Sequence, residues 1–188
     1  MLIKRCVDIS VALFAALVFA IPMALIAASV KFTSHGDVLY WSERVGQGNK
    51  LFWMPKFRTM KMNTPIVATH LLDNAAAHLT PIGAFLRKSS LDELPQLWCI
   101  LKGEMSLVGP RPALFNQADL IEARTRAGVH VLVPGLTGWA QVNGRDELEI
   151  PLKVAYDAEY LGLQSFFFDL SIIALTVAKV VRARGVSH

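Results

Sequence analysis

The nearly unbroken apolar segment at residues 11–30 constrains the fold of this chain more than any other feature. A segment of this length is long enough to cross a bilayer as one α-helix. Both of its flanks are basic, because Lys4 and Arg5 precede it and Lys31 begins a series of lysines and arginines that follows it. Basic flanks favour the cytoplasmic side of a membrane. The sequence therefore predicts that both ends of the segment lie on the same side.

Pro22 lies near the middle of this segment, where a bend would bring the two ends together. Proline is the usual cause of a sharp helix kink, because it has no N–H to donate and its ring clashes with the preceding turn. We expect a re-entrant membrane helix hairpin over residues 1–35 that breaks between Ile21 and Pro22. An ordinary spanning helix with a proline kink is the alternative that the charge pattern leaves open.

Composition narrows the classes of partner. Hydrophobic residues make up 53% of the chain and charged residues 18%, with a formal net charge of +4. The chain has no dense Lys/Arg run and no zinc-finger or helix-turn-helix pattern, so no nucleic acid partner is expected. A modest positive charge on an apolar chain suggests an anionic membrane surface or a phosphorylated ligand. Cys6 and Cys99 form no CxxC pair, which is typical of structural thiols in a reduced, cytosolic setting.

Residues 36–188 are predicted to form a globular catalytic domain on the cytoplasmic face, in a fold that is α+β and mostly helical. Two β-prone runs, residues 38–41 and 51–54, flank a Gly-rich turn and predict a small β-hairpin. Lys56 and Arg58 follow the second run. They are either phosphate contacts or charges that protect a strand edge from aggregation.

The remaining pattern is helical. Apolar spacing and turn signals predict helices at residues 71–79, 81–89, 90–101, 115–127, 146–162 and 166–181. The last of these is strongly apolar and is followed by basic residues. It suits an amphipathic helix lying in a membrane interface, and a buried core helix is the competing interpretation.

Asp92 and Glu93 form an acidic pair at the predicted start of a helix. Ser90 and Glu93 have the spacing of a capping box, and Asp92 would lie near the positive end of the helix dipole. That position favours an ionised Asp92, which is able to hold Mg²⁺ or attack phosphorus. Taken alone, the same residues are also consistent with simple helix capping.

Two loops carry further candidate ligands. In Gly109-Pro110-Arg111-Pro112, which we call the arginine loop, the prolines restrict the backbone around Arg111. A preset loop of this kind presents an arginine well to phosphate, although a surface turn with a carboxylate partner is equally compatible. The second loop, residues 134–145, is rich in glycine and carries Gln141, Asn143 and Arg145. Its glycines would let backbone approach a ligand while the amides bind polar edges.

These motifs occur in one order in one chain: Ser-Leu-Asp-Glu-Leu-Pro-Gln, Gly-Pro-Arg-Pro, Pro-Gly-Leu-Thr-Gly and Ala-Gln-Val-Asn-Gly-Arg. Together they resemble the bacterial sugar transferase family, the monotopic phosphoglycosyl transferases. The resemblance covers nearly the whole chain and is to the minimal form, without the multi-span domain of larger members. The family's membrane helix often breaks at Ser-Pro, whereas Ile21 stands before the proline here, which implies a shallower break.

The resemblance implies an enzyme that moves a sugar-1-phosphate from a UDP-sugar to polyprenyl phosphate and releases UMP. It implies that Asp92 is the catalytic nucleophile, that Mg²⁺ lies against its carboxylate, and that Glu93 either helps to hold the metal or tunes Asp92. Further site residues implied for the diphosphate are Arg87, Arg111 and Lys56 or Arg58. We assign the uridine end to Gln141, Asn143 and Arg145.

The same resemblance implies a protein at the cytoplasmic face of a bacterial inner membrane, in contact with membrane lipids and with later glycosyltransferases. No motif specifies which sugar is transferred. A catalytically silent membrane-bound module that binds nucleotide-sugars or tethers partner enzymes is the alternative. The intact acidic pair beside Arg87 and Arg111 argues against it, since a binding module needs no nucleophile. A purely structural anchor would leave both Gly-rich loops unexplained.

Overall fold

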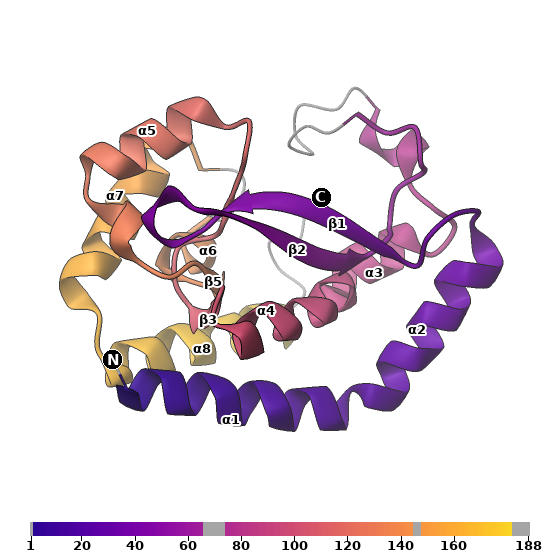
Figure 1. The fold of residues 1–188 in the computed structure, drawn as a ribbon, viewed down its shortest axis with the longest axis horizontal. Coiled ribbons are helices and arrows are strands. Elements are labelled where there is room, and N and C mark those ends of the chain that lie inside the picture. The colour runs from indigo at the N-terminus through magenta and orange to yellow at the C-terminus, as the bar shows by residue number, and fades with distance from the viewer. Residues whose placement is uncertain (1, 66–73, 145–147, 182–188) are drawn as a thin grey trace.

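The apolar N-terminal segment folds as two helices, α1 (Leu2–Val18) and α2 (Ala20–Thr33), which meet at a bend of 61°. They form the lower and right-hand edge of the molecule in Figure 1. The computed structural model describes residues 2–65, 74–144 and 148–181. Within these ranges no single helix is both long and apolar enough to cross a bilayer, whereas the bent pair reaches that length and composition together.

The bend lies at Phe19, so the predicted break between Ile21 and Pro22 is wrong by two to three residues. Pro22 is the third residue of α2 and has no N–H to offer the carbonyl of Val18, four residues earlier. The regular bonds resume when the Met23 N–H donates to the Phe19 carbonyl at 2.8 Å. The proline therefore breaks the helix where its missing bond would have been.

Both ends of the helix pair are fixed to the rest of the chain. In α1, Lys4 Nζ donates to the Val108 carbonyl at 3.0 Å, and Asp8 Oδ1 accepts the Leu107 N–H at 3.0 Å. Beyond α2, the Arg58 guanidinium donates to the Ser34 carbonyl at 3.1 Å and to the His35 carbonyl. The first turn of α1 and the end of α2 thus rest on one body, as Figure 1 shows.

The predicted hairpin is confirmed and is longer than expected, with β1 (Leu39–Val45) antiparallel to β2 (Leu51–Phe57). A short strand, β4 (Ala113–Leu114), extends it in the order β2-β1-β4. A second, parallel pair joins β3 (Ser106–Val108) to β5 (Gly135–Thr137). Sequence patterns did not predict β3, β4 or β5, because each is very short and pairs with a distant segment.

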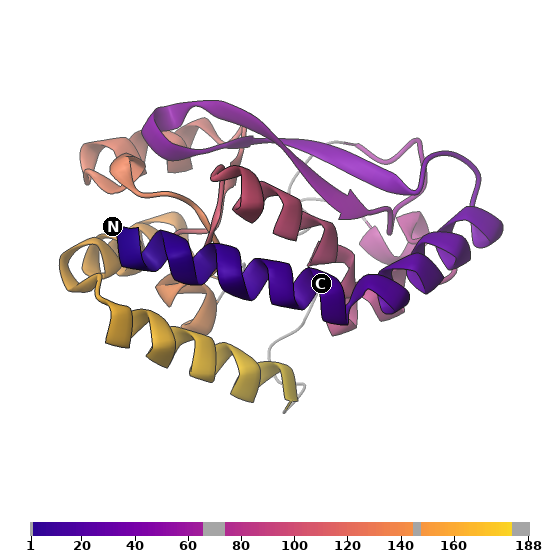
Figure 2. The same cartoon turned by 60° about the horizontal axis from the view of Figure 1, so that its bottom comes forward.

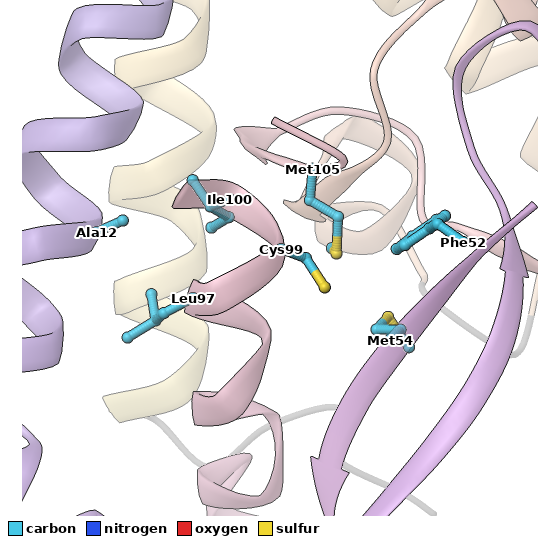
Figure 3. Packing of buried hydrophobic residues seen from close by; sticks show 7 residues of the cluster. All are labelled: Ala12, Phe52, Met54, Leu97, Cys99, Ile100 and Met105. Atoms are coloured by element: carbon cyan, nitrogen blue, oxygen red, sulfur yellow. The ribbon is translucent and has the colours of Figure 1, made fainter. Parts of the chain in front are cut away.

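The main core lies between the hairpin and α1, with α4 (Leu97–Lys102) in the middle. Figure 3 shows Cys99 directed toward Phe52 and Met54 of β2, while Ile100 faces Ala12 of α1. Ala12 is fully buried, and its small side chain lets α1 approach α4 closely. The N-terminal helix therefore shares its core with the rest of the molecule. The predicted boundary at residues 35 and 36 falls in the connection from α2 to β1.

The other helices follow the sequence pattern with shifted ends. The described α-helices beyond α4 are α5 (Ala118–Arg126), α6 (Trp139–Val142), α7 (Ile150–Leu163) and α8 (Phe166–Val181); α3 is Gly83–Ser89. The 3₁₀ helices are η1 (Gln47–Asn49), η3 (Ala75–His78), η4 (Leu91–Gln96) and η5 (Val129–Val131).

α8 starts at the predicted residue 166 and continues to the last described residue, Val181. α7 starts later than the predicted residue 146 because Pro151 suits a first helical turn. Of the helix predicted at residues 71–79, residues 71–73 lie outside the described ranges, and residues 75–78 form the 3₁₀ helix η3.

α8 exposes apolar side chains to its surroundings, so the interpretation as a buried core helix is wrong. Phe167 is 80% exposed and Val177 57%, whereas Ile172 is fully buried. In Figure 2, α8 runs beside α1, and Lys4 forms an ion pair with Asp169 there. α1 and α2 also expose large apolar side chains, among them Phe14 and Phe32. The molecule therefore presents apolar surface on three helices.

Candidate active site

The acidic pair lies in η4, the 3₁₀ helix that connects α3 to α4, and both side chains are buried. The predicted capping box does not form. Ser90 is both the C-cap residue of α3 and the N-cap residue of η4, and it adopts a left-handed conformation (φ 57°). Its side chain makes no cap hydrogen bond to η4. The Glu93 N–H donates to the Ser90 carbonyl at 3.2 Å. The Glu93 side chain is consequently available for tertiary contacts.

Glu93 joins two cations from different parts of the chain. Its Oε1 lies 2.9 Å from Lys56 Nζ and 3.2 Å from Arg111 Nη2. Lys56 comes from β2, on the face of the hairpin that packs against η4, and Arg111 comes from the arginine loop. Burial lowers the pKa of Lys56, while the Glu93 carboxylate acts in the opposite direction. Glu93 is thus the common partner that brings both cations to the acidic pair.

Asp92 stands beside this arrangement without a direct contact. Within the described residues, its carboxylate makes no hydrogen bond and no ion pair. Burial is the main cause that raises the pKa of Asp92 from an ordinary 3.8 to about 6; Glu93 acts in the same direction, and Lys56, Arg87 and Arg111 oppose it. This carboxyl group is more basic than an ordinary aspartate, so burial acts against the ionised form that the predicted position at a helix start would favour.

Arg87 reaches the site from α3, five residues before Asp92. Its Nε donates to Thr59 Oγ1 at 3.0 Å, which orients the guanidinium. Both acidic side chains raise the pKa of Arg87, although burial outweighs them and lowers it. The structure therefore brings together the acidic pair and three of the predicted phosphate-binding cations, which are Lys56, Arg87 and Arg111.

Other predicted site residues have different surroundings. The Arg58 guanidinium closes the end of α2, so it acts as a structural donor to main-chain carbonyls. Asn143 Nδ2 donates to the Trp139 carbonyl at 2.9 Å and so closes α6. The amide atoms of Gln141 are buried and make no hydrogen bond within the described residues. Arg145 lies outside the described residues.

Two glycines of the second loop, Gly135 and Gly138, lie against the arginine loop. A Cβ added at Gly135 would collide with the Gly109 nitrogen, and one at Gly138 would collide with the Gly109 carbonyl oxygen. Gly135 and Gly138 therefore permit close contact between the two loops. The Gly109 N–H donates to the Thr137 carbonyl at 2.9 Å across this contact.

The acidic pair offers few protein ligands to a metal ion. Among the described residues, no group of three or more His, Cys, Asp or Glu side chains is placed to hold one. Mg²⁺ suits such a site, because it is commonly bound by one or two carboxylates with water and substrate phosphates as the other ligands. Of the two acidic residues, Asp92 is the better candidate ligand for Mg²⁺, since Oε1 of Glu93 already contacts Lys56 and Arg111.

Sequence reasoning missed Arg44, Arg124 and Asp157, which surround the arginine loop. Arg44 Nη1 and Arg124 Nη1 donate to the carbonyls of Pro112 and Arg111, at 3.2 Å and 2.8 Å. Arg124 also pairs with Asp157. One signal was present: Arg124 stands four residues after Leu120, on the buried face of α5.

Comparison with known proteins gives consistent matches. The family model described as bacterial sugar transferase matches residues 1–183. The chain is 38% identical over its whole length to the uncharacterized sugar transferase EpsL of Bacillus subtilis, covering 92% of that protein. It is 39% identical over 97% of its length to the exopolysaccharide production protein ExoY of Rhizobium meliloti, covering 87% of that protein. It is also 40% identical to the UDP-glucose:undecaprenyl-phosphate glucose-1-phosphate transferase of Escherichia coli. That match covers 95% of this chain and 40% of the relative.

Proposed function

Because this chain belongs to the bacterial sugar transferase family, we propose that it transfers a sugar-1-phosphate from a UDP-sugar to undecaprenyl phosphate and releases UMP. The names of several relatives state this kind of transfer, and those of others refer to exopolysaccharide production. The observation that supports the proposal most strongly is the buried Asp92 carboxylate, which has three cations around it and no direct partner among the described residues.

Asp92 acts as the nucleophile in the proposed mechanism. One of its oxygens forms a bond to the phosphorus that carries the sugar, and the bond from that phosphorus to UMP breaks. An oxygen of the lipid phosphate then attacks the same phosphorus and releases the Asp92 carboxylate. The raised pKa of Asp92 supports this role, since a more basic carboxylate is a better nucleophile while it remains ionised at pH 7.

The cations neutralise the diphosphate. Phosphoryl transfer depends chiefly on positioning and on charge stabilisation at the phosphoryl oxygens. Arg87 and Arg111 present planar guanidinium groups that match phosphate oxygens, and Lys56 adds a buried ammonium. Glu93 holds Lys56 and Arg111 in place. Mg²⁺, bound through Asp92 and the substrate phosphates, would supply further charge neutralisation at the same oxygens.

We further propose that α1 and α2 form a re-entrant membrane anchor that enters and leaves at the cytoplasmic face. The bend of 61°, the apolar side chains exposed on both helices, and the attachment of both ends to one body support this arrangement. A straight spanning helix would place its ends on opposite sides. The exposed apolar side chains of α8 support an interfacial position for that helix.

A direct test measures UMP release from a panel of UDP-sugars by membranes that contain the protein, Mg²⁺ and undecaprenyl phosphate. Intact-protein mass spectrometry without the lipid acceptor should detect a phosphosugar adduct on Asp92. Asp92→Asn should abolish both signals, while Asp119→Asn, an exposed acid on α5, should leave them unchanged. Donor binding without any UMP release would instead support the catalytically silent module.

A further inference from the structure

The main chain of the arginine loop is fixed by hydrogen bonds at each of its four residues. Two of the bonds are made with β5: Gly109 N–H donates to the Thr137 carbonyl (2.9 Å), and Gly135 N–H donates to the Pro110 carbonyl (2.9 Å). The other two come from side chains: Arg124 Nη1 donates to the Arg111 carbonyl (2.8 Å), and Arg44 Nη1 donates to the Pro112 carbonyl (3.2 Å). A small pocket of about 30 Å³ lies against Arg111, Arg124 and His130. These bonds therefore help to fix the position of the loop.

Arg124, which donates to the Arg111 carbonyl, is itself held in a buried ion pair with Asp157. Its Nε and Nη2 donate to Oδ2 of Asp157 at 2.9 Å and 2.7 Å, and its Nη1 is then directed at the Arg111 carbonyl. The two side chains are only 9% and 1% exposed. A guanidinium is rigid and planar, so fixing two of its nitrogens on Asp157 fixes the direction of the third. Lysine has no planar guanidinium and so lacks this fixed geometry.

A contribution to folding stability is a weak explanation for the presence of this buried ion pair. Replacing a buried ion pair by apolar side chains of similar volume is often neutral or stabilising, because both charges must lose their hydration. Burial accordingly raises the pKa of Asp157 despite the opposing effect of Arg124. The pair does, however, supply a directed donor to a main-chain carbonyl, which apolar side chains are unable to do.

We propose that Arg124 and Asp157 form a positioning pair that sets the place of Arg111 against the acidic pair. Neither residue contacts the substrate; both act through the Arg111 main chain. The catalytic consequence rests on the proposed function, whereas the effect on the loop does not. On this view, α5 and α7 belong to the catalytic apparatus although they carry no catalytic residue.

The decisive variant combines Arg124→Met with Asp157→Leu, which removes both charges, keeps apolar volume and should still fold. We expect a thermal unfolding midpoint close to wild type and hydrogen–deuterium exchange of the segment at residues 105–115 that is about tenfold faster. Transfer should fall by about 10- to 100-fold, as a displaced phosphate ligand would cause. Arg126→Met is the matched control, because Arg126 lies two residues further along α5 with a side chain that is 72% exposed.

A second comparison places the same double substitution in an Arg111→Ala background. If the pair acts through Arg111, transfer should fall no further there, while exchange at residues 105–115 should still accelerate. Unchanged exchange in a folded double variant would overturn the proposal, as would an equal loss of transfer in both backgrounds. If wild-type protein transfers no sugar phosphate, the proposed function fails, and the exchange measurement still decides the role of the pair.

Discussion

Lys56 Nζ lies 2.9 Å from Glu93 Oε1, and both side chains are largely buried. This contact joins the hairpin to η4, two elements that are separated by more than thirty residues of sequence. Arg111 shares the same oxygen at 3.2 Å. Glu93 therefore organises the positive charge around Asp92, and this role distinguishes the two members of the acidic pair.

Glu93→Gln should cost both stability and activity. The amide has no charge to compensate Lys56 and Arg111, and breaking a buried ion pair typically costs on the order of 3 kcal/mol of unfolding free energy. Transfer should fall by about 10- to 100-fold, because two phosphate ligands lose their common partner. Urea unfolding and UMP release measure the two effects. Glu122→Gln, which removes an exposed pair with Arg126 at 3.6 Å, should change neither.

Asp92→Asn should stabilise the folded protein when Mg²⁺ is absent, although it abolishes transfer. The folded-state pKa of Asp92, about 6, lies above the ordinary 3.8, so the folded protein binds the proton more tightly than the unfolded chain. Wild-type stability should therefore fall as pH rises through the window between these values and level off above it. Asparagine carries no such penalty.

Thermal unfolding in EDTA at pH 4 and pH 8 tests this dependence. The variant and the wild type should unfold at similar temperatures at the lower pH, and the variant should be the more stable at the higher pH. Equal midpoints at both values would contradict the raised pKa.

Gly135→Ala should destabilise the contact between the two loops. Its Cβ would collide with the main chain of Gly109, and forcing a group into a packed site typically costs about 1–3 kcal/mol. Gly162→Ala is the control, because a Cβ there meets nothing within 4 Å and alanine has a higher helix propensity than glycine in the last turn of α7. We expect denaturant midpoints to move in opposite directions for the two variants.

The re-entrant anchor predicts that both ends of the helix pair are accessible from the same side. Single cysteines at Leu2 and Asp37, in a Cys6→Ser background, should react with an impermeant maleimide in inverted membrane vesicles and remain unlabelled in intact spheroplasts. Cys99 should stay silent, because it is fully buried and burial raises the pKa of its thiol to about 12. Labelling of the two positions from opposite sides would establish a spanning helix.

Local patterns predicted the elements whose signal lies within one segment. The hairpin around Gly46 and the start of α8 followed from alternation and helical periodicity. The bend was predicted from Pro22, but its position shifted because a proline affects the carbonyl four residues earlier. The strand pairs β1 with β4 and β3 with β5 depend on contacts between distant segments, which no local pattern encodes.

The candidate site divides in the same way. Asp92, Glu93, Arg87 and Arg111 were predicted from motifs, and Lys56 from its place at the end of the hairpin. The capping box failed because Ser90 already ends the preceding helix. Arg124 and Asp157 were missed because charged residues on helices usually face solvent, and only the packing of α5 on α7 buries this pair.

The attachment of α1 to β3 has a mechanical consequence. Lys4 and Asp8 bind the main chain of Val108 and Leu107, immediately before the arginine loop. In a bilayer, a change in lipid thickness that tilts α1 would therefore be transmitted through three residues of main chain from Val108 to Arg111. Turnover should respond to acyl-chain length, and a rate measured in detergent micelles should differ from the rate in membranes even when every catalytic side chain is intact.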